Sequence, residues 1–211
     1  MKKSGAITCL FVDVGGVLLS NGWDQGSRKL AAKAFHLDWN EMEERHLMNN
    51  DLLEIGKLSL EDYLSRVVFY KKRAFTRGKF RDFIFTQSKS YPEMIELIRE
   101  LKARYGLKIA VVSNEARELN SYRIEKFRLN EFVDFFVSSC YVGLRKPDEA
   151  IFCLALDLSQ TPPSKIVFID DRSMFVEIAR GLGMGGIHHE DFMSTRKKLA
   201  SLGLRGGEKL S

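Results

Sequence analysis

Residues 11–19 read FVDVGGVLL, a segment in which one carboxylate, Asp13, ends an apolar run and two glycines follow it. The stretch from Thr8 to Val12 has the continuous apolar pattern of a strand that is covered on both faces. Ligands of open parallel sheets bind beyond the carboxyl ends of the strands, and a residue directly after this strand would lie there. The segment therefore predicts a buried strand and a candidate functional residue.

Downstream of residue 91, strand-like and helix-like segments alternate. Short apolar runs predict strands at residues 107–112, 135–138, 165–169 and about 185–188, and helical periodicity predicts helices that begin at Pro92, cover residues 115–128, 148–158 and 173–182, and begin again at Ser194. Such alternation is typical of an α/β fold with a doubly wound parallel sheet and helices on both faces. We expect the strand before Asp13 to join this sheet.

Residues 20–88 differ in character and read as helical throughout. Apolar residues recur at helical spacing over residues 30–35 and 60–68, and residues 76–88 read as another helix. Ser59, followed by Glu61 and Asp62, predicts a helix start, because a serine caps the first turn and acidic residues favour it. We therefore expect a core made of residues 1–19 and 89–211, with residues 20–88 inserted as a helical cap.

The composition narrows the class of protein. The chain has 211 residues, of which 45% are hydrophobic, but no apolar run reaches the ~18 residues that suggest a membrane span. Its three cysteines lie scattered in apolar segments, which is typical of a reducing compartment. The net charge of +5 is compatible with anionic substrates, and the six cations between Lys71 and Arg81 are interpreted as a solvated helix surface rather than a nucleic-acid site. We expect a cytoplasmic monomer or homodimer without nucleic-acid or membrane partners.

Polar residues follow four of the predicted strands. They are Asp13, the pair Ser113-Asn114, Lys146 in the loop after the third strand, and the pair Asp170-Asp171. Each has a local explanation as a helix cap or a turn, but together they bring three carboxylates, a hydroxyl and a lysine to one sheet edge. Converging carboxylates need a divalent cation, and a set of oxygen ligands without His or Cys points to Mg²⁺. The lysine and hydroxyl suit a phosphoryl group.

These segments resemble the motifs of the haloacid dehalogenase superfamily of hydrolases, in the same order along the chain. FVDVGGVL is similar to the nucleophile motif, VVSNE to the phosphate-binding motif, GLRKPDEAIF to the lysine motif and FIDDRSMFVEIARGLGM to the acidic metal motif. The helical insertion occupies the position of the family's helical caps, and residues 54–64, EIGKLSLEDYL, resemble a segment found inside them.

The resemblance implies a role for each residue. Asp13 would attack phosphorus and form an aspartyl-phosphate, with Lys146 as its catalytic partner. Ser113, Asn114 and Lys146 would hold the phosphoryl oxygens of a small phosphorylated metabolite. Asp13, the backbone carbonyl of Gly15, and Asp170 or Asp171 would ligate Mg²⁺, with Asp171 favoured as the direct ligand. The cap would close over the site and select the substrate.

One family residue is missing, because Gly15 stands where relatives have the aspartate that protonates the leaving group. Three interpretations follow: a phosphatase for substrates with good leaving groups, such as a sugar 1-phosphate or an acyl phosphate; a catalytically impaired phosphate- or partner-binding protein; and, least favoured, a 2-haloacid dehalogenase. His36 or His46 could replace the missing acid, although a structural role is the favoured interpretation of each. Phe175 also departs from the family pattern, in which Asn is frequent.

Overall fold

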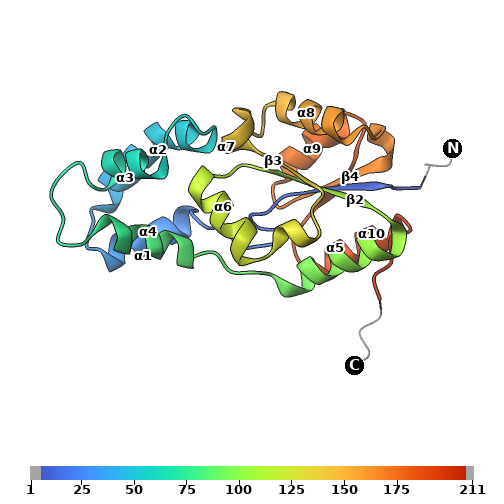
Figure 1. Cartoon of the computed structure of the whole chain (residues 1–211), viewed down its shortest axis with the longest axis horizontal. Helices are drawn as coiled ribbons and strands as arrows, with labels where there is room; N and C mark the ends of the chain where they lie inside the picture. The colour runs from blue at the N-terminus through green and yellow to red at the C-terminus, as the bar shows by residue number, and fades with distance from the viewer. Residues whose placement is uncertain (1–5, 208–211) are drawn as a thin grey trace.

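A five-stranded, fully parallel sheet forms the centre of the computed structural model, which describes residues 6–207 (Figure 1). The strands are β1 (Cys9–Val12), β2 (Lys108–Ser113), β3 (Phe135–Ser138), β4 (Ile166–Asp170) and β5 (Gly185–His188). Their spatial order is β3-β2-β1-β4-β5. From the central strand β1 the chain adds β2 and then β3 on one side, and then β4 and β5 on the other side of β1. The predicted doubly wound α/β fold is confirmed, and its topological switch point lies between β1 and β4.

Both faces of the sheet are buried, which explains the uninterrupted apolar runs. Along β1, Leu10 and Val12 belong to one core cluster, whereas Cys9 and Phe11 belong to the other, since successive side chains of a strand point to opposite faces. Helices α5 (Pro92–Tyr105) and α10 (Phe192–Ser201) contribute to the first cluster, and α8 (Glu149–Ser159) and α9 (Ser173–Gly181) contribute to the second.

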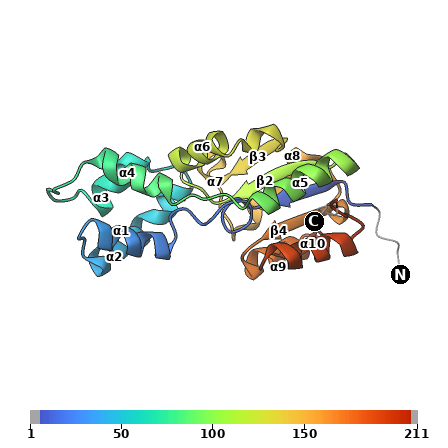
Figure 2. The same cartoon turned by 90° about the horizontal axis from the view of Figure 1, so that it is seen from below.

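Four helices are inserted between β1 and β2. They are α1 (Gln25–Ala34), α2 (Trp39–Glu54), α3 (Leu60–Val67) and α4 (Arg77–Thr86). They form most of a third apolar cluster, to which Ala116 and Leu119, from the segment after β2, also belong. Ser59 caps α3 as predicted, because its side chain accepts a hydrogen bond from the backbone N–H of Asp62. The four helices, called here the helical insertion, lie beyond the carboxyl end of β1 at one end of an elongated molecule (Figures 1 and 2).

Some predicted boundaries are wrong, and each error has a local cause. The helix expected over residues 115–128 is α6 (Arg117–Lys126), because Glu115 is buried in the connection that follows β2. The last helix begins at Phe192 rather than Ser194, because Asp191 caps it by accepting a hydrogen bond from the backbone N–H of Ser194. The remaining segments are short: α7 (Ser139–Val142) and two 3₁₀ turns, Leu129–Glu131 and Pro163–Lys165.

Within the described residues, no helix combines the length and the apolar character that a membrane span requires.

Candidate active site

Lys146 is the buried centre of the site. Its Nζ lies 2.6 Å from Oδ2 of Asp170 and 3.1 Å from Oδ2 of Asp13, and its side chain is 1% exposed. Burial by itself would lower the pKa of Lys146, but the carboxylates of Asp13 and Asp170 outweigh this effect and raise it. The lysine is therefore a fixed cation that joins the ends of β1 and β4, the two strands that flank the switch point.

Three carboxylates surround this single cation. Oxygens of Asp13, Asp170 and Asp171 all lie within 4.8 Å of one another. Burial and the neighbouring charge of Asp13 raise the pKa of Asp170 to about 7, although Lys146 and the backbone N–H of Arg172 act in the opposite direction. The three carboxylates thus exceed the charge that Lys146 can offset, and a divalent cation with oxygen ligands would relieve their repulsion.

The turn after β1 brings Asp171 close to the backbone. Gly16 has φ +74°, and a Cβ atom at this position would overlap the carboxylate of Asp171. The backbone N–H of Val14 donates to Oδ1 of Asp13 at 2.8 Å, which fixes the orientation of that carboxylate. The second glycine of the motif is therefore required both by its backbone conformation and by the close approach of Asp171.

Ser113 and Asn114, at the end of β2, have different surroundings. Ser113 is 1% exposed, and within residues 6–207 its hydroxyl has no hydrogen-bond partner. The side-chain amide of Asn114 bonds the backbone of Lys146 twice: Nδ2 donates to the Lys146 carbonyl and Oδ1 accepts from the Lys146 N–H, both at 2.8 Å. The amide that we expected to contact phosphate thus holds the loop of Lys146 in place, and its contact with substrate stays a prediction.

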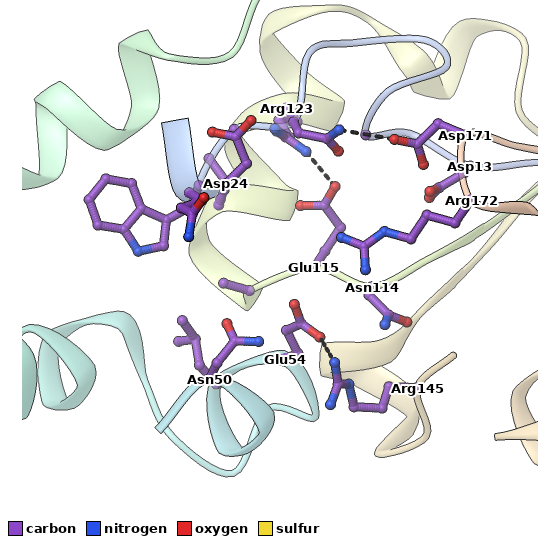
Figure 3. A pocket seen from close by; sticks show the side chains of 18 of the residues that line it. Asp13, Asp24, Asn50, Glu54, Asn114, Glu115, Arg123, Arg145, Asp171 and Arg172 are labelled. Carbon is purple, nitrogen blue, oxygen red and sulfur yellow. Dashed lines mark hydrogen bonds and ion pairs between the residues drawn. The ribbon is translucent and has the colours of Figure 1, made fainter. Parts of the chain in front are cut away.

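A cavity of about 350 Å³ lies between the strand ends and the helical insertion. Asp13, Gly15 and Asp171 border it from the sheet, whereas His46 and Asn50 border it from α2. Figure 3 shows side chains from both parts of the molecule projecting into it. Lys146 and Asp170 are not part of the lining. Both are buried behind Asp13 and bond to each other there.

Glu115 and Arg123 form a buried ion pair at the wall of this cavity (Figure 3). Nη1 of Arg123 donates to Oε1 of Glu115 at 2.5 Å, and both side chains are 3% exposed. Burial, together with the charge of Asp13, raises the pKa of Glu115 despite the opposing effect of Arg123. Sequence reasoning missed this pair. A signal was present, since Glu115 directly follows Ser113-Asn114, but an acidic residue near a helix start has an ordinary explanation.

The insertion contributes neutral polar groups. Nε1 of Trp23 donates to the Tyr63 hydroxyl at 2.8 Å, and that hydroxyl lies 2.8 Å from Nδ1 of His46. Burial lowers the pKa of His46 to about 4, so its imidazole is neutral near pH 7. His36 adopts a positive φ of 52° in the turn after α1 and does not line the cavity. Of the two histidines considered from the sequence, only His46 faces the site.

Arg145, the residue before Lys146, connects the sheet to the insertion. Its guanidinium forms ion pairs with Asp51 and, at 2.8 Å, with Oε2 of Glu54, both at the C-terminal end of α2. Ser139 adds a hydrogen bond from its hydroxyl to the Glu54 carbonyl at 2.6 Å. The end of α2 is therefore attached to the segment that also carries the buried lysine.

The chain is similar to curated proteins that are named phosphatases. The chain is 28% identical over 138 residues to the phosphorylated carbohydrates phosphatase of Thermotoga maritima, covering 65% of this chain and 59% of that protein. It is 30% identical over 110 residues to the sesquiterpene phosphatase astK of Aspergillus oryzae, covering 52% of this chain and 55% of that one. The chain thus spans less than two thirds of the length of these relatives, and 11% of acyl-CoA dehydrogenase family member 10 of Mus musculus.

A solved structure shares the fold. The HAD family enzyme bt-2542 of Bacteroides thetaiotaomicron superposes with a TM-score of 0.75 at 18% identity, covering 88% of this chain and 96% of that one. The wild-type form of that enzyme has also been solved as a complex with magnesium and inorganic phosphate. The sequence profile of the haloacid dehalogenase-like hydrolases matches residues 7–183, and the chain therefore belongs to this family of hydrolases.

Proposed function

We propose that this protein is a Mg²⁺-dependent phosphatase that hydrolyses a small phosphorylated metabolite through an aspartyl-phosphate on Asp13. One observation carries the proposal: the fixed cation of Lys146 joins Asp13 to Asp170, with Asp171 beside them, at the switch point of the sheet. Relatives that are named phosphatases support this class of reaction.

Asp13 is the nucleophile in this proposal. Val14 N–H and Lys146 Nζ hold one carboxylate oxygen each, so the side chain is oriented toward the cavity before substrate arrives. A carboxylate oxygen attacks phosphorus, the bond from phosphorus to the leaving oxygen breaks, and water then hydrolyses the aspartyl-phosphate. Lys146 balances negative charge on the phosphoryl oxygens, as does the hydroxyl of Ser113 by donating a hydrogen bond.

The donor set fits Mg²⁺, since carboxylate and carbonyl oxygens are its preferred ligands. Asp13, the Gly15 carbonyl and Asp171, with Asp170 behind them, would hold the ion. Both oxygens of Asp170 already accept hydrogen bonds, from Lys146 and from Arg172 N–H, whereas within residues 6–207 Asp171 accepts only one, from Asn21. This difference favours Asp171 as the direct ligand. Bound magnesium would neutralise carboxylate charge and polarise the phosphoryl group.

The helical insertion acts as the cap in this proposal, with residues 20–88 as cap and residues 1–19 and 89–211 as core. A cavity of about 350 Å³ suits a small metabolite, and its lining of amide, imidazole and charged groups suits a polar leaving group such as a sugar. Closure of the cap would exclude water that is not needed for hydrolysis.

A second candidate is a phosphate- or partner-binding protein with impaired catalysis. The glycine at position 15 is the observation that favours this candidate, because the family's usual proton donor is absent. Such a donor typically raises the rate ~10²–10⁴-fold. A dehalogenase remains the third candidate, and the acidic pair Asp170-Asp171 argues against it because halide displacement needs no metal.

Phosphate release from a panel of sugar phosphates, nucleotides, acetyl phosphate and an aryl phosphate tests the proposal. We expect turnover that requires Mg²⁺ and is lost in Asp13→Asn. Absence of turnover on every member, together with binding of inorganic phosphate by calorimetry, would favour the second candidate.

A further inference from the structure

The space of the missing aspartate is filled by side chains from elsewhere in the chain. A Cβ atom at Gly15 would lie 2.5 Å from Oδ1 of Asn21 and 3.9 Å from Nη1 of Arg123. Asn21 is anchored there, because its Nδ2 donates to Oδ2 of Asp171 at 3.1 Å. The loss of one side chain is therefore accompanied by two polar groups that converge on the same place.

Arg123 is held in a single position. Its Nε donates to the Ser88 hydroxyl at 3.0 Å, its Nη2 to the Ser20 carbonyl at 2.9 Å and its Nη1 to Glu115. A Cβ atom at Gly22 would overlap the guanidinium. Gly22 thus leaves the room that the guanidinium occupies. The same Nη1 that lies 3.9 Å from the Cβ position of Gly15 also bonds Glu115, so Arg123 connects Glu115 to the space of the missing acid.

Glu115 borders the same cavity as Asp13. Its Oε1 accepts from Nη1 of Arg123, and among the described residues no hydrogen bond is made to its other oxygen, Oε2. The charged groups that act on it are Asp13 at the end of β1, Arg123 on α6 and Glu54 on α2. Burial raises its pKa above the ordinary value, which favours the protonated carboxyl group that a general acid needs.

We propose that Glu115 performs the proton transfers that the family assigns to the residue at position 15, with Arg123 as its positioning residue. This inference rests on the proposed phosphatase function and widens its substrate class. With an acid in place, the substrates include ordinary alkyl phosphate monoesters, whose alkoxide leaving groups need a proton, in addition to acyl and other activated phosphates.

Glu115 would transfer one proton in each of the two steps, formation and hydrolysis of the aspartyl-phosphate. In the first, an oxygen of Asp13 bonds to phosphorus while the bond from phosphorus to the leaving oxygen breaks, and the proton of the Glu115 carboxyl moves to that oxygen, releasing an alcohol. In the second, the Glu115 carboxylate takes a proton from the water whose oxygen attacks phosphorus. The bond from phosphorus to Asp13 breaks, and inorganic phosphate leaves with Asp13 and Glu115 in their starting states.

The dependence of the rate on the leaving group tests this role. In Glu115→Gln, kcat/KM for an alkyl phosphate should fall by ~10²-fold or more, whereas kcat/KM for an aryl phosphate with an acidic phenol should change by only a few-fold. Glu118→Gln is the matched control. Glu118 accepts a hydrogen bond from the backbone N–H of Leu60, the first residue of α3, and does not line the cavity. An equal loss on both substrates, or no loss on either, would overturn the assignment.

Wild-type pH profiles give a second readout that needs no variant. Since the acid acts in its protonated form, kcat/KM for the alkyl phosphate should decline as pH rises through the raised pKa of Glu115, and the aryl phosphate should lack this decline. Coincident profiles would contradict the proposal.

A rescue experiment completes the test. Gly15→Asp combined with Asn21→Gly should restore turnover of the alkyl phosphate in the Glu115→Gln background, since it returns an acid to the vacated space. Failure to rescue, in a variant that still hydrolyses the aryl phosphate, counts against Glu115. If the wild type hydrolyses neither the alkyl nor the aryl phosphate, the phosphatase function itself is refuted. Failure of the Glu115 assignment can therefore be told apart from failure of the proposed function.

Discussion

Gly15 and Gly16 both follow Asp13, the proposed nucleophile, but they serve different purposes. At Gly16 the backbone has φ +74° and the Asp171 carboxylate lies against the Cα, so a side chain is excluded. At Gly15 the obstacle is only the flexible end of Asn21. The first position is thus open to substitution if Asn21 is shortened, whereas the second is not.

Gly16→Ala should therefore destabilise the protein more than an alanine at another glycine of positive φ. Gly106 is the matched control, since it has φ +64° and nothing within 4 Å of its added Cβ. We expect Gly106→Ala to lower the free energy of unfolding by about 1 kcal/mol, from backbone strain alone. Gly16→Ala should cost more, because Asp171 must also move. Urea denaturation measures both, and equal losses would contradict the predicted steric conflict.

His46 predicts a pH dependence of stability. Its pKa is about 4 in the folded state and ordinarily 6.5, so the unfolded chain takes up the proton first as pH falls. The contribution of neutral His46 is therefore fully present above about pH 6.5 and is lost between pH 6.5 and 4, by up to about 3 kcal/mol at ~1.4 kcal/mol per pKa unit. Denaturation of the wild type and His46→Gln at pH 7.5 and 5 isolates the effect. Identical slopes against pH would rule it out.

At the scale of elements, Arg123 stabilises the junction between the sheet and the insertion. The two connecting segments run side by side, with the backbone N–H of Ser20 donating to the Lys89 carbonyl at 2.8 Å and the Ser20 hydroxyl to the Gln87 carbonyl at 2.9 Å. Arg123 bonds one residue from each segment, Ser20 and Ser88. Helix α6 is thus attached to both connections of the insertion.

Arg145 attaches the far side of the insertion, and its removal should loosen α2. Its partners Asp51 and Glu54 are 73% and 21% exposed, so the two ion pairs together contribute on the order of 1 kcal/mol. Arg145→Met should raise the rate of hydrogen exchange at the C-terminal end of α2 by up to about ten-fold, and raise KM. Arg99→Met, which removes an ion pair with Glu131 outside the site, serves as control. Unchanged exchange in Arg145→Met would mean that other contacts hold α2.

The elements were predictable from sequence to the extent that their signals are local. Apolar runs gave the strands, and the edge where Asp13, Lys146, Asp170 and Asp171 meet followed from the parallel arrangement of those strands. The Glu115–Arg123 pair was not predictable, because it depends on a contact between a loop and a helix turn that each have ordinary explanations. Asn21 was missed for a similar reason, since its partner Asp171 lies 150 residues away in sequence.

At the scale of the whole molecule, the acidic cluster predicts that stability depends on a divalent cation. Three carboxylates face one lysine, so Mg²⁺ that binds only the folded state should stabilise it, by about 2.7 kcal/mol at 100 times its dissociation constant. Thermal unfolding with Mg²⁺ and with EDTA measures this, and Asp171→Asn should reduce the shift. A wild-type Tm that is insensitive to Mg²⁺ would contradict the proposed ligand set.

The most direct measurement of the central claim is the location of the phosphoryl group during turnover. Wild type and Asp13→Asn would be mixed with acetyl phosphate and Mg²⁺, quenched in acid, and digested for peptide mass spectrometry. We predict a phosphoryl group on Asp13 in the wild type, absent without Mg²⁺ and absent in Asp13→Asn. Turnover that proceeds with no phosphoryl group on Asp13, or with one on another residue, would contradict an aspartyl-phosphate mechanism at this site.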